Sequence, residues 1–334
     1  MTAIGNWRRL RLQAGYFSGL AALAGLRAAD RGLILKIDRV RPRRSEAFQP
    51  LKARELTPEQ LERAISSLRR WKVEFLSIDQ LCARLAAPRR SGRFVCLSFD
   101  GGSRDLLRFG APVLARQGVP YTMYLPTAFP DGLGTPWWLA LEQVIARHDR
   151  LALMIDGVER RFDCASLDDK YHVYHFLSNW MQSLAAADLS PALADLCQRY
   201  SVDLQALARE ASMGWDEVIP LAADPLVTIG SATVNFAELA RLDDASAQRE
   251  IRMGRAVAEA ALGRGVPHLA FPFGTSGSFD GRHVRMAEQA GFASAVTALP
   301  GAVTAKSNRL ALPRVTFDGS RRSLRMLKAM LSGL

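Results

Sequence analysis

An aspartate ends the most strand-like run of the chain. Residues 93–99 read RFVCLSF, and Asp100 follows, with Gly101, Gly102 and Ser103 after it. In α/β proteins the carboxyl ends of parallel strands carry the functional loops. A carboxylate at that place can act as a general base if burial raises its pKa. The alternative, which we favour, is a relic carboxylate that the following backbone N–H groups hold and that serves stability alone.

Other residues that could bind a metal ion are scattered. Asp38 and Asp105 could join Asp100 at the strand ends and hold a weakly bound Mg²⁺ or Ca²⁺. His172 and His175 are three residues apart, but their aromatic neighbours indicate a packed helix. The remaining histidines, expected to be ordinary core or surface residues, are His148, His268 and His283. The four cysteines form no C-x-x-C pair, which argues against a zinc ribbon and favours free thiols in a reducing compartment.

Alternating strands and helices must position these side chains. The apolar pattern predicts strands at 32–37, 75–78, 93–99, 121–125, 226–229, 268–273 and 293–297. Helices are expected at 57–71, 80–85, 106–116, 245–262 and 282–290, the first of them opened by a capping box from Thr57 to Gln60. Repeated β/α units imply a parallel sheet with right-handed crossovers and favour a barrel-like sheet.

A mostly helical insertion is expected at about 135–220. It carries four tryptophans whose rings could stack on a sugar, although a core role is the more common one: Trp137, Trp138, Trp180 and Trp215. The domain division that follows is an amphipathic basic helix at 1–31 and a barrel at 32–334 that contains this insertion.

Five segments carry a family resemblance. In order they are FVCLSFDGGSRDLL, GVPYTMYLPTAF, TIGSATVNFAEL, HLAFPFGTSG and GFASAVTALPG, with ALPR after the last. Together they resemble the bacterial polysaccharide (chitooligosaccharide) deacetylases, the NodB-homology family, from near Ile34 to Arg314. The resemblance implies a distorted (β/α) barrel with its active site at the C-terminal strand ends. It also implies hydrolysis of an acetyl group from an amino sugar of an oligo- or polysaccharide.

The metal ligands of that family are replaced. Its T-F-D-D motif supplies a base and then a ligand to a divalent metal such as zinc, whereas this chain has Asp100 and then Gly101. The H-[S/T]-x-x-H motif supplies two imidazoles, but Ala232 and Phe236 stand there. Glycine, alanine and phenylalanine offer no side-chain donor atom. The comparison therefore predicts no metal cofactor.

Other family positions also differ. The R-x-P-[F/Y] motif survives as Ala270 to Phe273 without the arginine that would orient the base, and Asp38 replaces a histidine common in relatives. No histidine near the C-terminus can serve as the usual general acid. We interpret the chain as a metal-free pseudoenzyme that binds saccharide or supports surface polysaccharide synthesis. Its expected substrate-binding residues are Phe99, Thr233, Asn235, Pro272 and Phe273. The alternative is an active hydrolase with Asp100 as base and an unrecognised ligand set.

The positive charge is concentrated near the N-terminus. Residues 1–44 hold 10 Lys/Arg against 2 Asp/Glu, out of a net charge of +11. An apolar stripe in residues 4–24 predicts an amphipathic helix that lies on a membrane surface or packs on its own domain. Arginines 39, 41, 43 and 44 are spaced to ring an anion, although a solvated basic turn is favoured. We expect a cytoplasmic protein, peripherally membrane-bound through residues 1–44 if at all, and no nucleic-acid partner.

Overall fold

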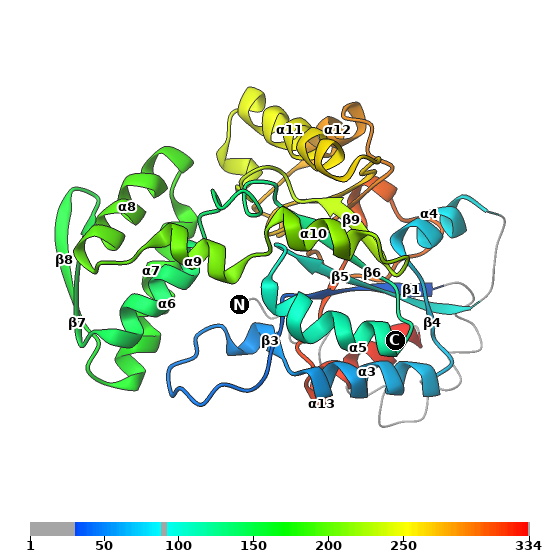
Figure 1. The fold of residues 1–334 in the computed structure, drawn as a ribbon, viewed down its shortest axis with the longest axis horizontal. Coiled ribbons are helices and arrows are strands. Elements are labelled where there is room, and N and C mark those ends of the chain that lie inside the picture. Colours follow the sequence, from blue (N-terminus) through cyan, green and yellow to red (C-terminus); the bar gives the residue numbers. More distant parts are fainter. Residues whose placement is uncertain (1–30, 88–91, 333–334) are drawn as a thin grey trace.

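The computed structural model describes residues 31–87 and 92–332. These residues form a curled sheet wrapped by helices, with a separate lobe beside it (Figure 1). The predicted helix at 4–24 and most of the predicted turn at 88–92 lie outside the described residues. No helix within 31–87 or 92–332 combines the length and the apolar character that a membrane crossing requires.

Parallel strands build the sheet in the order β11, β10, β9, β6, β5, β1, β12, and β4 pairs with the start of β5. Their bounds are Arg31–Ile37 (β1), Glu74–Phe75 (β4), Arg93–Asp100 (β5), Tyr121–Leu125 (β6), Val227–Ser231 (β9), His268–Ala270 (β10), Ser294–Val296 (β11) and Val315–Thr316 (β12). Main-chain hydrogen bonds join the edge strand β11 to the segment just before β12: Thr297 donates to the Leu312 carbonyl (2.9 Å) and Leu312 to the Ala295 carbonyl (2.8 Å). The α/β class and the parallel sheet are thus confirmed, and the sheet is strongly curled.

Helices cover the convex face (Figure 1). They are α3 (Pro58–Arg70), α5 (Ala111–Arg116), α10 (Trp215–Ala222), α11 (Asp244–Leu262), α12 (Gly281–Gln289) and α13 (Arg321–Leu331). Helix α4 (Ile78–Ala86) instead packs its buried residues on the apolar cluster inside the sheet. The predicted capping box at Thr57 opens α3. A second one at Ser77 opens α4, so the strand predicted at 75–78 was wrong at its end, where Ile78 is helical. The turn Leu106–Gly110 before α5 is a π-helix.

Alternation along the strands divides their side chains between two cores. Leu33, Leu35, Val95 and Leu97 face the helices in the larger core. Residues on the opposite side of the same strands fill the concave interior with a second apolar cluster, which includes Ile34, Cys96, Tyr124, Ala232, Ala270 and Val296. Lys36, Ser98 and Asp100 continue this inward-facing row toward the C-terminal strand ends. Because side chains of a strand alternate between its two faces, only every second residue of a strand can reach a site there.

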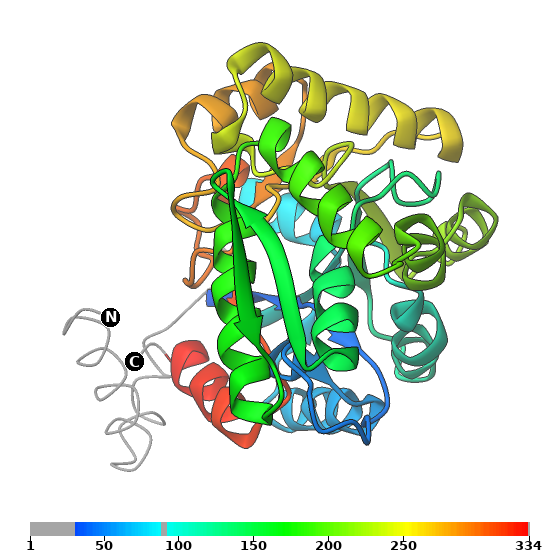
Figure 2. The same cartoon turned by 90° about the vertical axis from the view of Figure 1, so that its left-hand side faces the viewer.

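The lobe is formed by residues 137–211 and has its own apolar core. Its elements are α6 (Trp137–Arg147), β7 (Arg150–Ile155), β8 (Val158–Asp163), α7 (Leu167–Ser183), α8 (Ala186–Arg199) and α9 (Leu204–Ala211). Figure 2 shows the β7–β8 hairpin on the outer side of these helices. The hairpin was not expected from the sequence. Short strands β2 (Arg39–Val40) and β3 (Glu55–Leu56) pair with each other between the lobe and the sheet.

Candidate functional site

Asp100, at the end of β5, is held by an arginine from the far end of the chain. Its two oxygens accept hydrogen bonds from Nη1 and Nη2 of Arg314, at 2.6 and 2.8 Å. Both side chains are buried, with 0% of Arg314 and 5% of Asp100 exposed. A bidentate guanidinium–carboxylate pair is strong and fixes the orientation of the carboxylate. Arg314 thus orients Asp100, so the conclusion from the third motif that no arginine would orient the base was wrong.

Further contacts fix Arg314 itself. Its Nε donates to the Thr297 carbonyl (2.7 Å) and its Nη1 also donates to the Ser98 hydroxyl (3.2 Å). The guanidinium lies 5.6 Å from the centre of the Tyr124 ring. The sequence had suggested that backbone N–H groups after Asp100 would hold it, which was wrong, because Gly101 donates instead to the Tyr124 carbonyl (2.8 Å).

A lysine supplies a second positive charge beside Asp100. Lys36 of β1 lies with its Nζ 3.9 Å from Asp100 Oδ2 and forms a close ion pair with Asp38. Burial by itself raises the pKa of Asp100, but the charges of Arg314 and Lys36 and the hydrogen bonds from Arg314 outweigh it. The pKa of Asp100 is therefore lowered. The carboxylate of Asp100 is therefore ionised at neutral pH and is a weak proton acceptor.

The family's metal site does not fit the residues present. Gly101 has φ +99°, a backbone conformation that an aspartate rarely adopts. Ala232 is fully buried and Phe236 packs against Phe129 and Phe273, with ring centroids 6.5 and 5.3 Å apart. At these three positions the chain therefore differs from the family's metal site in backbone conformation and packing as well as in side-chain donor atoms.

The loop that carries Phe236 is anchored from α11. Glu250 accepts hydrogen bonds from the backbone N–H groups of Val234 (3.0 Å) and Asn235 (2.9 Å). Thr233 and Phe236 both have positive φ, at 67° and 57°. Such conformations persist where the surroundings over-determine them. The phenylalanine is therefore part of a fixed wall.

The three aspartates proposed as a weak metal site are separated by different cations. Asp100 pairs with Arg314, Asp38 with Lys36, and Asp105 lies 3.7 Å from both Arg39 and Arg41. No group of three potential ligands among His, Cys, Asp and Glu occurs in the described residues. The three-carboxylate site that the sequence left open as an alternative is therefore not formed among the described residues.

A cavity of about 350 Å³, here called the site cavity, opens above Asp100. Charged residues on its wall are Lys36, Asp38, Arg39, Arg54 and Asp100, and aromatic ones are Phe129, Trp138, Phe236 and Phe273. Trp138 belongs to α6 of the lobe, so the lobe forms one side of the cavity. A smaller cavity of about 190 Å³ shares Trp138, Gln182, Phe236 and Phe273, and the rest of its wall comes equally from the lobe and from outside it, mainly residues 235–242.

The predicted binding residues divide into two groups. Phe273 lines both cavities and Asn235 lines the smaller one. Phe99 was placed wrongly, because it alternates with Asp100 and packs in the larger core against Tyr121. Thr233 is fully buried and Pro272 is buried, and neither is on a cavity wall described here. Sequence reasoning missed Lys36, Arg54 and the pairing of Arg314, and it favoured a core role for Trp138.

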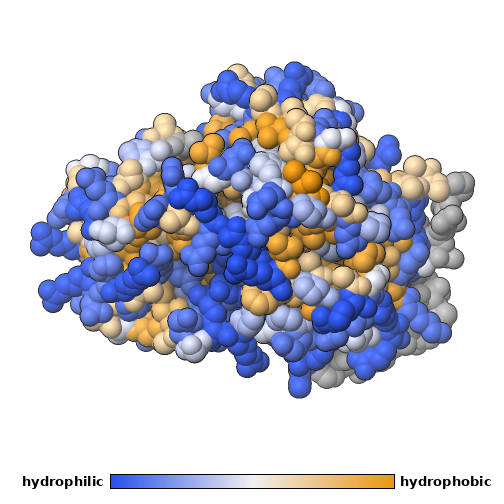
Figure 3. Space-filling view, viewed as in Figure 1, coloured by the Kyte–Doolittle hydropathy of each residue, from blue (hydrophilic) through white to orange (hydrophobic). Residues whose placement is uncertain are grey.

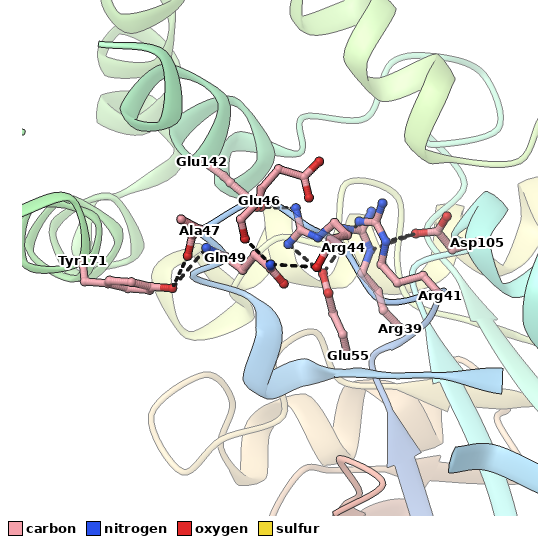
Figure 4. A network of polar contacts seen from close by, with 10 residues as sticks. All are labelled: Arg39, Arg41, Arg44, Glu46, Ala47, Gln49, Glu55, Asp105, Glu142 and Tyr171. Atoms are coloured by element: carbon pink, nitrogen blue, oxygen red, sulfur yellow. Dashed lines mark hydrogen bonds and ion pairs between the residues drawn. The ribbon is translucent and has the colours of Figure 1, made fainter. Parts of the chain in front are cut away.

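The basic segment 39–44 is not a solvated turn. Arg44 donates to Glu142 (2.8 Å) and Glu55 (3.2 Å), and Arg41 lies 3.7 Å from Glu55 (Figure 4). These arginines line a third cavity of about 950 Å³, here called the arginine cavity, between the lobe and the sheet. Figure 3 shows hydrophilic side chains gathered in a band across the front of this junction. Arg43 remains exposed.

A second polar cluster lies at the opposite, N-terminal end of the strands. The ring of His268 contacts the Ser294 hydroxyl through Nδ1 (2.8 Å) and Asp79 through Nε2 (2.9 Å). The order serine, histidine, aspartate matches that of a hydrolytic triad. Ser294 is fully buried, however, so substrate cannot reach its hydroxyl. This cluster is therefore structural.

No family model and no curated protein matches the sequence. Solved structures match the fold. The deacetylase PplD of Streptococcus pyogenes, in complex with acetate, has a TM-score of 0.60 at 12% identity, over 91% of this chain and 99% of that one. A polysaccharide deacetylase from Bacillus cereus gives 0.55 at 13% identity, over 90% and 69%. A de-N-acetylase from Aggregatibacter actinomycetemcomitans gives 0.54 at 14% identity, over 87% and 96%. The chain therefore has the fold of the polysaccharide deacetylases, as its five sequence segments indicated.

Proposed function

We propose that this chain binds saccharide in the site cavity and does not catalyse metal-dependent deacetylation. The observation that carries the proposal is the set of side chains at the family's ligand positions. Gly101, Ala232 and Phe236 stand there and supply no donor atoms. Gly101 has φ +99°, and Phe236 packs against Phe129 and Phe273, so backbone and packing differ as well. The hydrolase alternative would keep Asp100 as base but would need metal ligands other than these three residues.

Saccharide binding is supported by the chemistry of the wall. Trp138, Phe236 and Phe273 offer aromatic faces, on which the C–H groups of a sugar ring can pack. Gln182 and Ser212 add polar groups that can bind hydroxyls. The mixture of aromatic surface and a few polar groups is typical of a small-ligand site. The fold neighbours named as deacetylases make a carbohydrate the first ligand class to test.

The test is isothermal titration of the full chain with N-acetylglucosamine oligomers and a panel of neutral and acidic oligosaccharides, all in chelator. We expect saturable binding that Trp138→Ala weakens by about two- to tenfold, as loss of a stacking ring would. Trp71→Ala is the matched control, because Trp71 is also half-buried but lies at the end of α3. Absence of binding by every member of the panel would refute the proposal.

A further inference from the structure

The site cavity and the arginine cavity adjoin one another along the junction of lobe and sheet. Both are lined by Arg39, Leu139 and Ala211. A ligand longer than one sugar residue can therefore leave the site cavity past Arg39 and continue along the arginine cavity. The two cavities differ in character, since the first has the aromatic wall and the second is dominated by basic residues.

Basic residues outnumber acidic ones along this path, by nine to six among the described residues that line the two cavities. Three of the arginines are exposed and make no ion pair with any described residue. They are Arg54 in the site cavity, and Arg108 and Arg147 in the arginine cavity. Their guanidinium groups are available to a ligand.

Arg39, at the junction, is incompletely neutralised. Its nearest carboxylate is Asp105, whose Oδ2 is 3.7 Å from Nε and is shared with Arg41 at the same distance. That distance is too long for a hydrogen bond. Burial lowers the pKa of Arg39, and the attraction of Asp105 offsets this only in part. An additional carboxylate would complete the partners of this guanidinium.

We propose that the two cavities together bind one oligosaccharide that carries carboxylate groups, an oligouronate in chemical class. This inference rests on the proposed function and specifies its ligand. The aromatic wall takes a sugar ring beside Asp100, and the arginines along the path pair with carboxylates of the following residues. The planar guanidinium fork suits carboxylates because it donates two parallel hydrogen bonds.

Titration of the full chain with three probes tests the inference: a hexamer of galacturonate, a neutral hexamer of N-acetylglucosamine, and inorganic polyphosphate as a polyanion without sugar rings. We expect the uronate to bind at least about tenfold more tightly than either of the others, and its affinity to fall as salt is raised. Equal or tighter binding of the neutral hexamer would overturn the inference while leaving the proposed function intact. Equal or tighter binding of polyphosphate would overturn it as well. Absence of binding by the uronate would overturn the inference, whereas the proposed function falls only if every saccharide of its own panel also fails to bind.

Single variants locate the contacts. Arg54→Ala and Arg108→Ala are each expected to weaken uronate binding by about tenfold, since each removes one charge-assisted pair. Arg160→Ala is the control, because Arg160 is an exposed arginine of β8 that lines neither cavity. Melting temperatures of the variants establish that they are folded. Loss of affinity in Arg54→Ala with none in Arg108→Ala would contradict a ligand that spans both cavities, as would equal losses in all three variants.

Discussion

The two ends of the curled sheet hold polar clusters of similar composition and opposite accessibility. At the C-terminal end the carboxylate of Asp100 is buried, and a cavity of about 350 Å³ opens above it. At the N-terminal end the carboxylate of Asp79 is 58% exposed, while its partner His268 and the serine behind it are buried. An apolar layer that includes Cys96, Ala232 and Val296 separates the two clusters.

Residue types alone therefore do not identify a site. The N-terminal cluster has the serine, histidine and aspartate of a hydrolase, but its nucleophile cannot meet a substrate. The C-terminal cluster lacks the metal ligands of the family motifs that the sequence resembles, but a cavity opens beside it. In parallel α/β sheets the C-terminal strand ends carry function and the opposite ends carry stability. The cavity at the C-terminal ends is where this rule places a site, and the buried N-terminal cluster fits the structural role.

The largest expected effect is at the C-terminal cluster. Arg314→Met leaves the buried Asp100 without its partner, and breaking such a pair costs about 3–5 kcal/mol in the free energy of unfolding. Because the pKa of Asp100 is lowered in the folded protein, its pairing contributes stability above the unfolded pKa, and this contribution is lost as pH falls through the folded value. Urea unfolding at pH 7 measures the cost.

The double variant Asp100→Asn with Arg314→Met is the control for this prediction. It removes both charges, so it should recover most of the lost stability. If the single variant loses less than about 1 kcal/mol, the ion pair does not hold this end of the sheet in the way described here.

A smaller effect is expected when the family's ligands are restored. Gly101→Asp must adopt φ +99°, and strain of this kind costs about 1–3 kcal/mol. We therefore expect the triple variant Gly101→Asp, Ala232→His, Phe236→His to be destabilised and to retain less than one equivalent of zinc after dialysis. Metal analysis checks this. One tightly held equivalent would show that the backbone accommodates the ligands and that only side chains were lost.

The smallest effect is expected at the exposed carboxylate of the N-terminal cluster. The hydrogen bond from His268 lowers the pKa of Asp79, so this pair stabilises the fold above the unfolded pKa and the contribution disappears as pH falls below about 4. Because Asp79 is largely exposed, Asp79→Asn should cost at most about 1 kcal/mol at pH 7. Unfolding at pH 7 and pH 3 should show the difference from the unsubstituted protein shrinking at low pH. A change in saccharide affinity in Asp79→Asn would show that the N-terminal cluster is coupled to the site cavity.

Most of the sheet could be predicted from sequence because its strands are short apolar runs between helices. Asp100 was placed correctly at a strand end for the same reason. The pairing of Arg314 could not be predicted from spacing, since 214 residues separate it from Asp100 and the contact depends on how the sheet curls. Lys36 could have been identified as a site residue from the sequence, because a lysine inside an apolar strand faces either solvent or a polar interior.

Two other features, the direction of Phe99 and the β7–β8 hairpin, could have been predicted from side-chain alternation in strands and from turn composition. Phe99 had to face away from Asp100, because neighbouring residues of a strand point to opposite sides. The β7–β8 hairpin has Asp156-Gly157 at its turn, with φ of 52° and 78°, which is the preferred pair for a tight hairpin. The shape of the cavities was beyond sequence rules, because the lobe and the sheet form them jointly from residues far apart in the chain.

We propose that this pocket binds its ligand without a catalytic metal. The most direct test is acetate release from acetylated chitooligosaccharide by the purified full chain, measured with added zinc and with chelator, alongside the metal content of the same sample. We predict less than one equivalent of bound metal and no acetate release that the chelator abolishes. One equivalent of metal together with chelator-sensitive acetate release would contradict the account.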